Sequence, residues 1–314
     1  MDYNTEKNFI SQFADISIAG YNEEVRRIDT PYGVFTVTSV GDPRLSALVT
    51  VHDIGLNHDS NFNSFFKNPE VYNLTCNVCV FHIDMPGQES GAETLVVNQK
   101  TYPTILELVS GFEFVLAEYR IENFIGLGYG AGAYILSLLA LANPELVSNL
   151  VLINASAEPA TWTDYAYMQG CAALMRTDGF SRGVQEYLRW YHCGRDEIRL
   201  SHLISTFDIR IFAQNPKNLA DWMESYGKRP SLRLQRPTNS LDRVKERNFR
   251  CPVLLIVGQE SPHLEETRKM FAQCDPQLVN ILELTNCRTP LDECPMKVLE
   301  AMLLAFQGKI QDIA

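Results

Sequence analysis

Short apolar runs alternate with longer segments of helical spacing along most of this chain. Eight runs have the length and the apolar content of strands: residues 24–29, 33–40, 47–52, 78–83, 123–128, 149–154, 252–258 and 280–284. Strands that are apolar on both sides are typical of a parallel sheet covered by helices on both faces. A hairpin-like turn at residues 30–32 joins the first two runs, so we expect eight strands in a mostly parallel sheet.

Four of the intervening segments are the clearest helices: residues 102–119, 131–142, 264–272 and 295–307. The alternation breaks between residues 155 and 250, where a segment rich in Tyr, Trp, Arg and Asp precedes the seventh strand. This order predicts a single domain over residues 1–314 with an α/β-hydrolase fold. A helical cap at residues 156–250 would then lie between strands six and seven. Other doubly wound sheets share this order, so the alternation alone leaves them open.

Charge and cysteine content restrict the partners and the compartment. The formal net charge of −11 argues against nucleic acid as the main partner, because binding to phosphate requires an excess of Lys and Arg. The first twenty residues lack the long apolar run of a secretory signal, and the eight cysteines are too scattered for a disulfide scaffold. Residues 124–144 carry no charge, but four closely spaced glycines make a membrane span a poor interpretation. We therefore expect a cytoplasmic protein without a transmembrane segment.

The strand expected at residues 123–128 runs into GYGAG at residues 128–132. In α/β hydrolases, the nucleophile sits at this point on a strained turn between a strand and a helix, flanked by small residues. The flanking Gly128 and Gly132 match that pattern, but the nucleophile position holds Gly130. A glycine has no side chain with which to attack a carbonyl.

The other two positions of the expected catalytic triad also lack the usual residues. Ser261 stands where the acid follows the seventh strand, with Glu260 beside it as a carboxylate displaced by one position. After the eighth strand, where the histidine belongs, the nearest match is Arg288. Because an active triad needs a nucleophile, a base and an acid in contact, no catalytic residue is expected.

Residues His52, Asp53 and Tyr129 are candidates for the lining of a vestigial pocket beside Gly130. The loop that begins at His52 stands where hydrolases often build part of the oxyanion hole. Asp53 would place a negative charge near a developing oxyanion, which is the wrong sign. His52 and Asp53 could line a ligand pocket, or they could simply cap and tie the loop.

Several long motifs resemble one family. They are HDIGLNH at 52–58, HIDMPGQESGA at 82–92, GLGYGAGAYIL at 126–136, and LANPELVSNLVLINASAEPATWTDYA at 141–166. Together with CPVLLIVGQESPH at 251–263, they are similar to the N-myc downstream-regulated (Ndr) family over about residues 28–308. The resemblance implies an α/β-hydrolase fold without hydrolase activity, and a role in growth, differentiation, stress response, signalling or vesicle trafficking.

Two other functions remain open at this point. One is an esterase or lipase with an unconventional nucleophile, for which the candidates are Cys287, Ser261 and Ser137. The other is a module that binds a small apolar ligand in an enclosed cavity beside Gly130.

Neither a cofactor nor a metal is expected. The dinucleotide-like glycine pattern at residues 126–133 lacks an acid at the end of the following strand, which ends at Asn154. The pair Cys76 and Cys79 has no second pair at the spacing of a zinc site.

Protein partners are expected through the cap, which carries an aromatic cluster: Trp162, Tyr165, Tyr167, Tyr187, Trp190 and Tyr191. These rings could also pack the cap onto the sheet or close over a lipid-like ligand. Residues 225–250 hold eight basic residues against two acidic ones. That segment would make at most a weak contact with anionic lipid, and a solvated loop between the cap and the core is the preferred interpretation.

Overall fold

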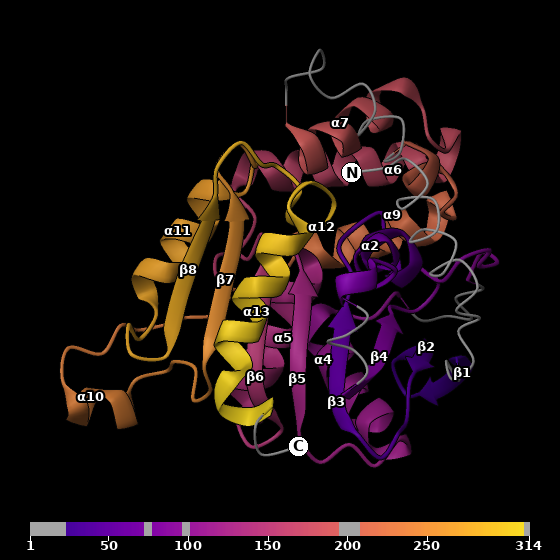
Figure 1. Cartoon of the computed structure of the whole chain (residues 1–314). Coiled ribbons are helices and arrows are strands. Elements are labelled where there is room, and N and C mark those ends of the chain that lie inside the picture. The colour runs from indigo at the N-terminus through magenta and orange to yellow at the C-terminus, as the bar shows by residue number, and fades with distance from the viewer. Residues whose placement is uncertain (1–22, 72–76, 96–100, 195–207, 311–314) are drawn as a thin grey trace, which may run out of the picture.

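The computed structural model describes residues 23–71, 77–95, 101–194 and 208–310. Eight strands form one sheet in the order β1-β2-β4-β3-β5-β6-β7-β8 (Figure 1). Their bounds are β1 Glu23–Thr30, β2 Gly33–Val40, β3 Ser46–Val51, β4 Val78–Asp84, β5 Phe124–Tyr129, β6 Val147–Ile153, β7 Val253–Gly258 and β8 Val279–Leu284. The pairings β1–β2 and β2–β4 are antiparallel and the other five are parallel, which confirms the predicted sheet.

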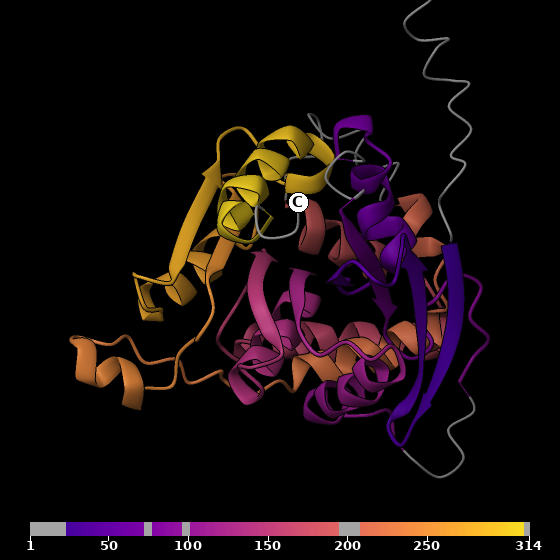
Figure 2. The same cartoon turned by 60° about the horizontal axis from the view of Figure 1, so that its bottom comes forward.

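Helices cover both faces of this sheet (Figures 1 and 2). The core helices are α2 His58–Phe66, α4 Ile105–Glu118, α5 Ala131–Ala142, α11 Leu264–Gln273, α12 Pro290–Glu293 and α13 Pro295–Ile310. α4, α5 and α11 pack with one apolar cluster, and α2 and α13 pack with a second cluster on the opposite face. The chain thus has the three-layer arrangement that buried parallel strands require.

The uncharged stretch at residues 124–144 is divided between two elements. Its first part is β5, and its second part is α5, which is buried on nearly all sides. A turn at Gly130 separates them, so the apolar run is explained by burial inside the fold. Within the described residues, no helix is both long enough and apolar enough to span a bilayer.

The predicted helical cap is inserted between β6 and β7. Its helices α6 Trp162–Asp178, α7 Arg182–Cys193 and α9 Pro216–Gly227 lie at the carboxyl ends of the parallel strands (Figure 1). A short helix, α10 Ser240–Lys245, lies apart from these three in both views (Figures 1 and 2). An ion pair of 2.6 Å between Arg243 and Asp275 ties it to the segment before β8. This ion pair therefore links α10 to the core of the domain.

Candidate functional site

The turn between β5 and α5 has the backbone shape of a nucleophile elbow. Gly130 has φ 51° and ψ −110°, a conformation that side-chain-bearing residues adopt only under strain. A Cβ atom on Gly132 would lie 2.0 Å from the carbonyl oxygen of Val51, so the helix also passes very close to β3. The positive φ explains the glycine at position 130, and the close approach to β3 explains the glycine at position 132. The turn therefore has the shape of an elbow although Gly130 has no nucleophilic side chain.

The space that a nucleophile would occupy at this elbow is filled by Asp53. A Cβ atom built on Gly130 would lie 2.1 Å from the Asp53 carboxyl group. Asp53 itself has no exposed surface, so its side chain is fixed among buried neighbours. Any side chain at position 130 therefore competes with this carboxyl group for the same volume.

Asp53 also binds the two backbone groups that form an oxyanion hole in α/β hydrolases. Its Oδ1 accepts hydrogen bonds from the N–H of Ala131 and the N–H of Ile54, each at 2.8 Å. These are the amide after the nucleophile position and an amide from the loop after β3, the two donors that stabilise the oxyanion. Asp53, whose negative charge has the wrong sign for an oxyanion hole, thus occupies that hole itself.

The cap closes over this carboxyl group from above. The Tyr191 hydroxyl of α7 donates to Asp53 Oδ1 at 3.2 Å, and His192 Nδ1 lies 3.9 Å from Oδ2. Burial raises the pKa of Asp53 to about 7, although the Ala131, Ile54 and Tyr191 donors partly offset it. No hydrogen bond to Oδ2 occurs within the described residues. Asp53 therefore joins the β3 loop, the elbow and the cap at one buried point.

A family model described as the Ndr family matches residues 25–309. The chain belongs to the Ndr family. Protein NDRG3 of Xenopus laevis is 35% identical over 286 residues, which cover 90% of this chain and 74% of that protein. Human Protein NDRG2 is 30% identical over 290 residues, which cover 91% of this chain and 74% of that protein.

Solved structures show the fold of this Ndr chain to be that of α/β hydrolases. A carboxylesterase of the archaeon Nitrososphaera gargenis has a TM-score of 0.69 at 17% identity, covering 92% of this chain and 100% of that one. The enol-lactonase of Burkholderia xenovorans has a TM-score of 0.69 at 14% identity, and the match covers 90% of this chain and 100% of that one. These likenesses confirm the predicted fold and carry no activity to this chain.

His52 and Tyr129, the other pocket candidates of this Ndr chain, are both buried and bonded within the protein. The His52 ring accepts from the N–H of Met85 at 3.1 Å through Nε2, so its Nδ1 carries the proton and donates to the Asp53 carbonyl at 2.8 Å. Burial lowers the pKa of His52. The Tyr129 hydroxyl accepts from the Asn154 amide at 3.2 Å. The side chains of His52 and Asp53 thus both tie the loop, but they form no hydrogen bond with each other.

The remaining triad positions are occupied by a structural ion pair and a buried hydroxyl. Arg288 and Glu260 form an ion pair of 2.8 Å between the loops that follow β8 and β7. The Ser261 hydroxyl donates to Asn154 Oδ1 at 3.2 Å. Arg288 at the base position thus forms a salt bridge with Glu260, the residue beside the acid position, and this pair links the two loops.

None of the three alternative nucleophiles contacts an imidazole ring in the described part of the Ndr chain. Ser137 donates to the carbonyl of Ala133 in its own helix at 2.8 Å, and Ser261 is bonded as described above. Cys287 has no exposed surface, and burial raises the pKa of its thiol. A nucleophile needs a neighbouring base or a lowered pKa, and these residues have neither.

The space beside Gly130 is packed with side chains. A large cavity exists, but it lies on the cap between α6 and α7, and its lining does not include Gly130 or Asp53. The interpretation as a module that binds an apolar ligand in the vestigial pocket required an enclosed cavity at Gly130. The packing there counts against it.

The basic segment at residues 225–250 is largely engaged in internal contacts. Five arginines bind carbonyl or carboxylate oxygens of the same chain: Arg229, Arg236, Arg243, Arg247 and Arg250. Lys228 pairs with Glu224 at 2.6 Å. Of the cysteine pair considered as a metal site, Cys79 is buried in β4, and Cys76 lies outside the described residues.

Replacing Asp53 with asparagine is expected to remove a pH-dependent loss of stability. The folded protein holds a proton on Asp53 up to about pH 7, whereas an unfolded aspartate releases it near pH 3.8. The contribution of Asp53 to stability therefore falls as the pH rises through this window, and asparagine has no such dependence. Between pH 5.5 and 7, the variant should gain about 2 kcal/mol relative to the wild type in urea unfolding.

Glu113→Gln is the matched control for this measurement, because Glu113 is an exposed acid on α4. Its difference from the wild type should stay constant across the same pH range. A constant difference for Asp53→Asn as well would show that Asp53 is ionised in the folded protein throughout this range.

Proposed function

We propose that this Ndr protein is a pseudohydrolase that acts as an intracellular adaptor in signalling, stress response or trafficking during growth and differentiation. The observation that carries the non-enzymatic part is the Asp53 carboxyl group bound in the oxyanion hole. The adaptor role is supported by membership of the Ndr family and by the exposed aromatic rings on the cap, such as Trp162 and Tyr167.

The occupied hole opposes acyl transfer in two ways. Both amide donors already bind Asp53, so a substrate carbonyl would have to displace a buried carboxyl group to reach them. At a pH above about 7, that group also carries a negative charge, which repels a developing oxyanion. Loss of a single oxyanion donor lowers turnover about 10²–10³-fold in a working hydrolase, and here both are taken.

Purified protein should therefore hydrolyse a panel of short-chain esters no faster than a heat-killed sample. The matched variants Ser261→Ala, Ser137→Ala and Cys287→Ser remove the alternative nucleophiles one at a time, and each should leave this background unchanged. Ester hydrolysis that survives repurification and disappears in one of these variants would establish an unconventional hydrolase and end the pseudohydrolase proposal.

Partner binding is assigned to the cap rather than to the basic segment at 225–250. Cap helix α6 exposes Trp162 to 82% and Tyr167 to 61%, and Trp and Tyr are residue types enriched in binding hot spots. Most arginines of the basic segment are already bonded within the protein, which leaves a contact with anionic lipid weakly supported.

A further inference from the structure

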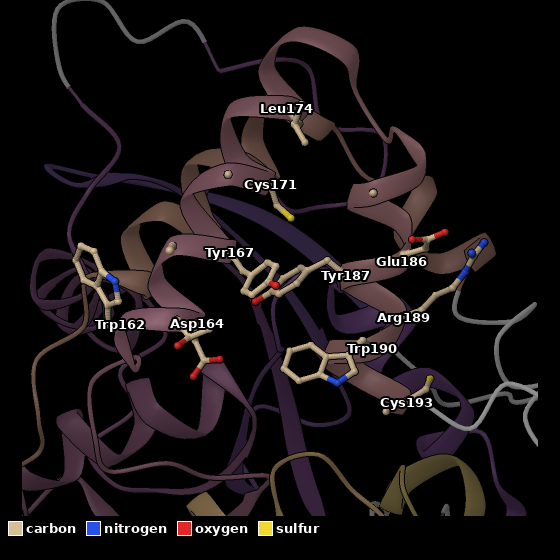
Figure 3. A pocket seen from close by; sticks show the side chains of 15 residues that line it. Trp162, Asp164, Tyr167, Cys171, Leu174, Glu186, Tyr187, Arg189, Trp190 and Cys193 are labelled. Carbon is tan, nitrogen blue, oxygen red and sulfur yellow. The ribbon is translucent and has the colours of Figure 1, made fainter.

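A large groove lies on the cap between α6 and α7, away from the vestigial elbow. Its volume is about 1240 Å³, which exceeds the range typical of small-molecule pockets. Tyr167 projects into it from α6, and Tyr187 and Trp190 project from α7, so that three aromatic rings meet at its centre (Figure 3). The centroid of the Tyr187 ring lies 6.2 Å from that of Tyr167 and 5.9 Å from that of Trp190.

The basic side chain in the lining is neutralised by an acid outside the groove. Arg189 donates two hydrogen bonds of 2.7 Å to Asp208, one to each carboxylate oxygen. Glu186, which also lines the groove, pairs with Arg182 at 2.7 Å one turn away. These two pairs leave little net charge on the α7 wall of the groove.

Asp164 on the α6 wall has a different environment. Its carboxylate accepts a hydrogen bond from the Thr161 hydroxyl at 2.6 Å, and no ion pair to it is found in the described ranges. Asp164 is a lining residue of the groove and lies on the same helix as Tyr167 (Figure 3). Within the described residues, the groove thus combines aromatic faces with one carboxylate that has no ion-pair partner.

We propose that this groove binds an organic monocation that carries apolar groups, of the quaternary or alkylated ammonium type. The faces of Tyr and Trp rings attract such cations within about 6 Å, and the apolar groups bury against the same rings. Asp164 supplies the opposite charge. A neutral apolar ligand would desolvate this carboxylate without compensation, and an anion would be repelled by it.

This groove shares no residue with the elbow or the oxyanion hole, so it does not depend on the pseudohydrolase proposal, although Trp162 and Tyr167 also belong to the cap surface proposed for partner binding. An active esterase with this cap would carry the same groove. The two proposals can therefore fail separately.

Benzyltrimethylammonium is the probe, and its binding is followed by tryptophan fluorescence and by saturation-transfer NMR. Two of the three tryptophans, Trp162 and Trp190, line the groove, and the third, Trp222, is fully buried. Choline should displace the probe, whereas 3,3-dimethylbutan-1-ol, which has carbon in place of the charged nitrogen, should not displace it at the same concentration. Displacement by both compounds equally would show an apolar site and overturn the proposal.

Two variants test the groove residues in a folded protein. Tyr167→Leu removes an exposed ring and Asp164→Asn removes the charge, and each should weaken probe binding about 3- to 30-fold. The matched controls Phe114→Leu and Glu113→Gln change an exposed ring and an exposed acid on α4, and should alter the affinity by less than about twofold. Unchanged affinity in Asp164→Asn, or no binding by the wild type at about 10 mM probe, would refute a cation site.

Discussion

Gly130→Ala is expected to lower the free energy of unfolding by about 3–5 kcal/mol, although it adds one methyl group. Part of the loss, about 1–2 kcal/mol, comes from a φ of 51°, which is strained for any residue with a Cβ atom. The rest comes from Asp53, whose carboxyl group would be 2.1 Å from the new atom and must leave the Ala131 and Ile54 amides. Urea unfolding at pH 7 measures the change.

A double-mutant cycle separates these two causes. In the Asp53→Ala background the carboxyl group is gone, so Gly130→Ala should cause only the backbone share of the loss, and the coupling should exceed about 1 kcal/mol. Gly170→Ala is the matched control, because a Cβ atom there meets nothing within 4 Å in the middle of α6. It should be neutral or stabilise by up to about 1 kcal/mol. Additive losses in the cycle would mean that Asp53 does not occupy the nucleophile space.

The second large effect is a steep loss of stability on mild acidification. Burial lowers the pKa of His82 and of His192 to about 3, and that of His263 to about 4, from an ordinary value of 6.5. Each stays neutral in the folded protein and gains a proton on unfolding, so the stability it contributes is present above pH 6.5 and is lost as the pH falls. Asp53 opposes this with one proton, because its folded pKa is raised. These four groups give a net slope near pH 5 of about 2–3 kcal/mol per pH unit, and His52, whose pKa burial also lowers, acts in the same direction.

Urea midpoints measured between pH 7.5 and 5 test this slope. His263→Gln keeps a donor for the Tyr191 carbonyl, which His263 Nε2 contacts at 2.9 Å. The variant should take up about one proton fewer on unfolding, which makes the slope of stability against pH shallower. Asp53→Asn should make it steeper by a similar amount, since it removes the opposing group. A wild-type stability that does not change between pH 7 and 5 would show that these histidines are not buried in their neutral form.

Most of the fold follows from local patterns, because fully apolar runs in this chain correspond to strands buried on both faces. The helix α2 was not anticipated, because His58–Phe66 mixes three phenylalanines with Asn, Ser and Asp, which favour turns. The missed signal is the reciprocal cap between Asn57 and Ser60. α4 begins at Ile105 rather than residue 102, because Thr104 caps it and forms a capping box with Glu107.

The empty nucleophile position was readable from Gly130, but its occupant was not. Asp53 and Ala131 are 78 residues apart, and their hydrogen bond depends on how the loop after β3 folds onto the elbow. The contact from Tyr191 depends in addition on where the cap settles. The charge argument predicts only that Asp53 is incompatible with an oxyanion. Only the three-dimensional arrangement shows that it binds the same amides.

The fit between Asp53 and Gly130 also restricts how a serine nucleophile could be introduced at the elbow. A serine introduced first at position 130 would collide with the Asp53 carboxyl group, and a small residue introduced first at position 53 would leave the Ala131 and Ile54 amides buried without an acceptor. Either order passes through a destabilised intermediate that gains no activity, because Arg288 is bonded to Glu260 where the base should be. At these two positions, therefore, neither substitution is a favourable first step towards a serine nucleophile.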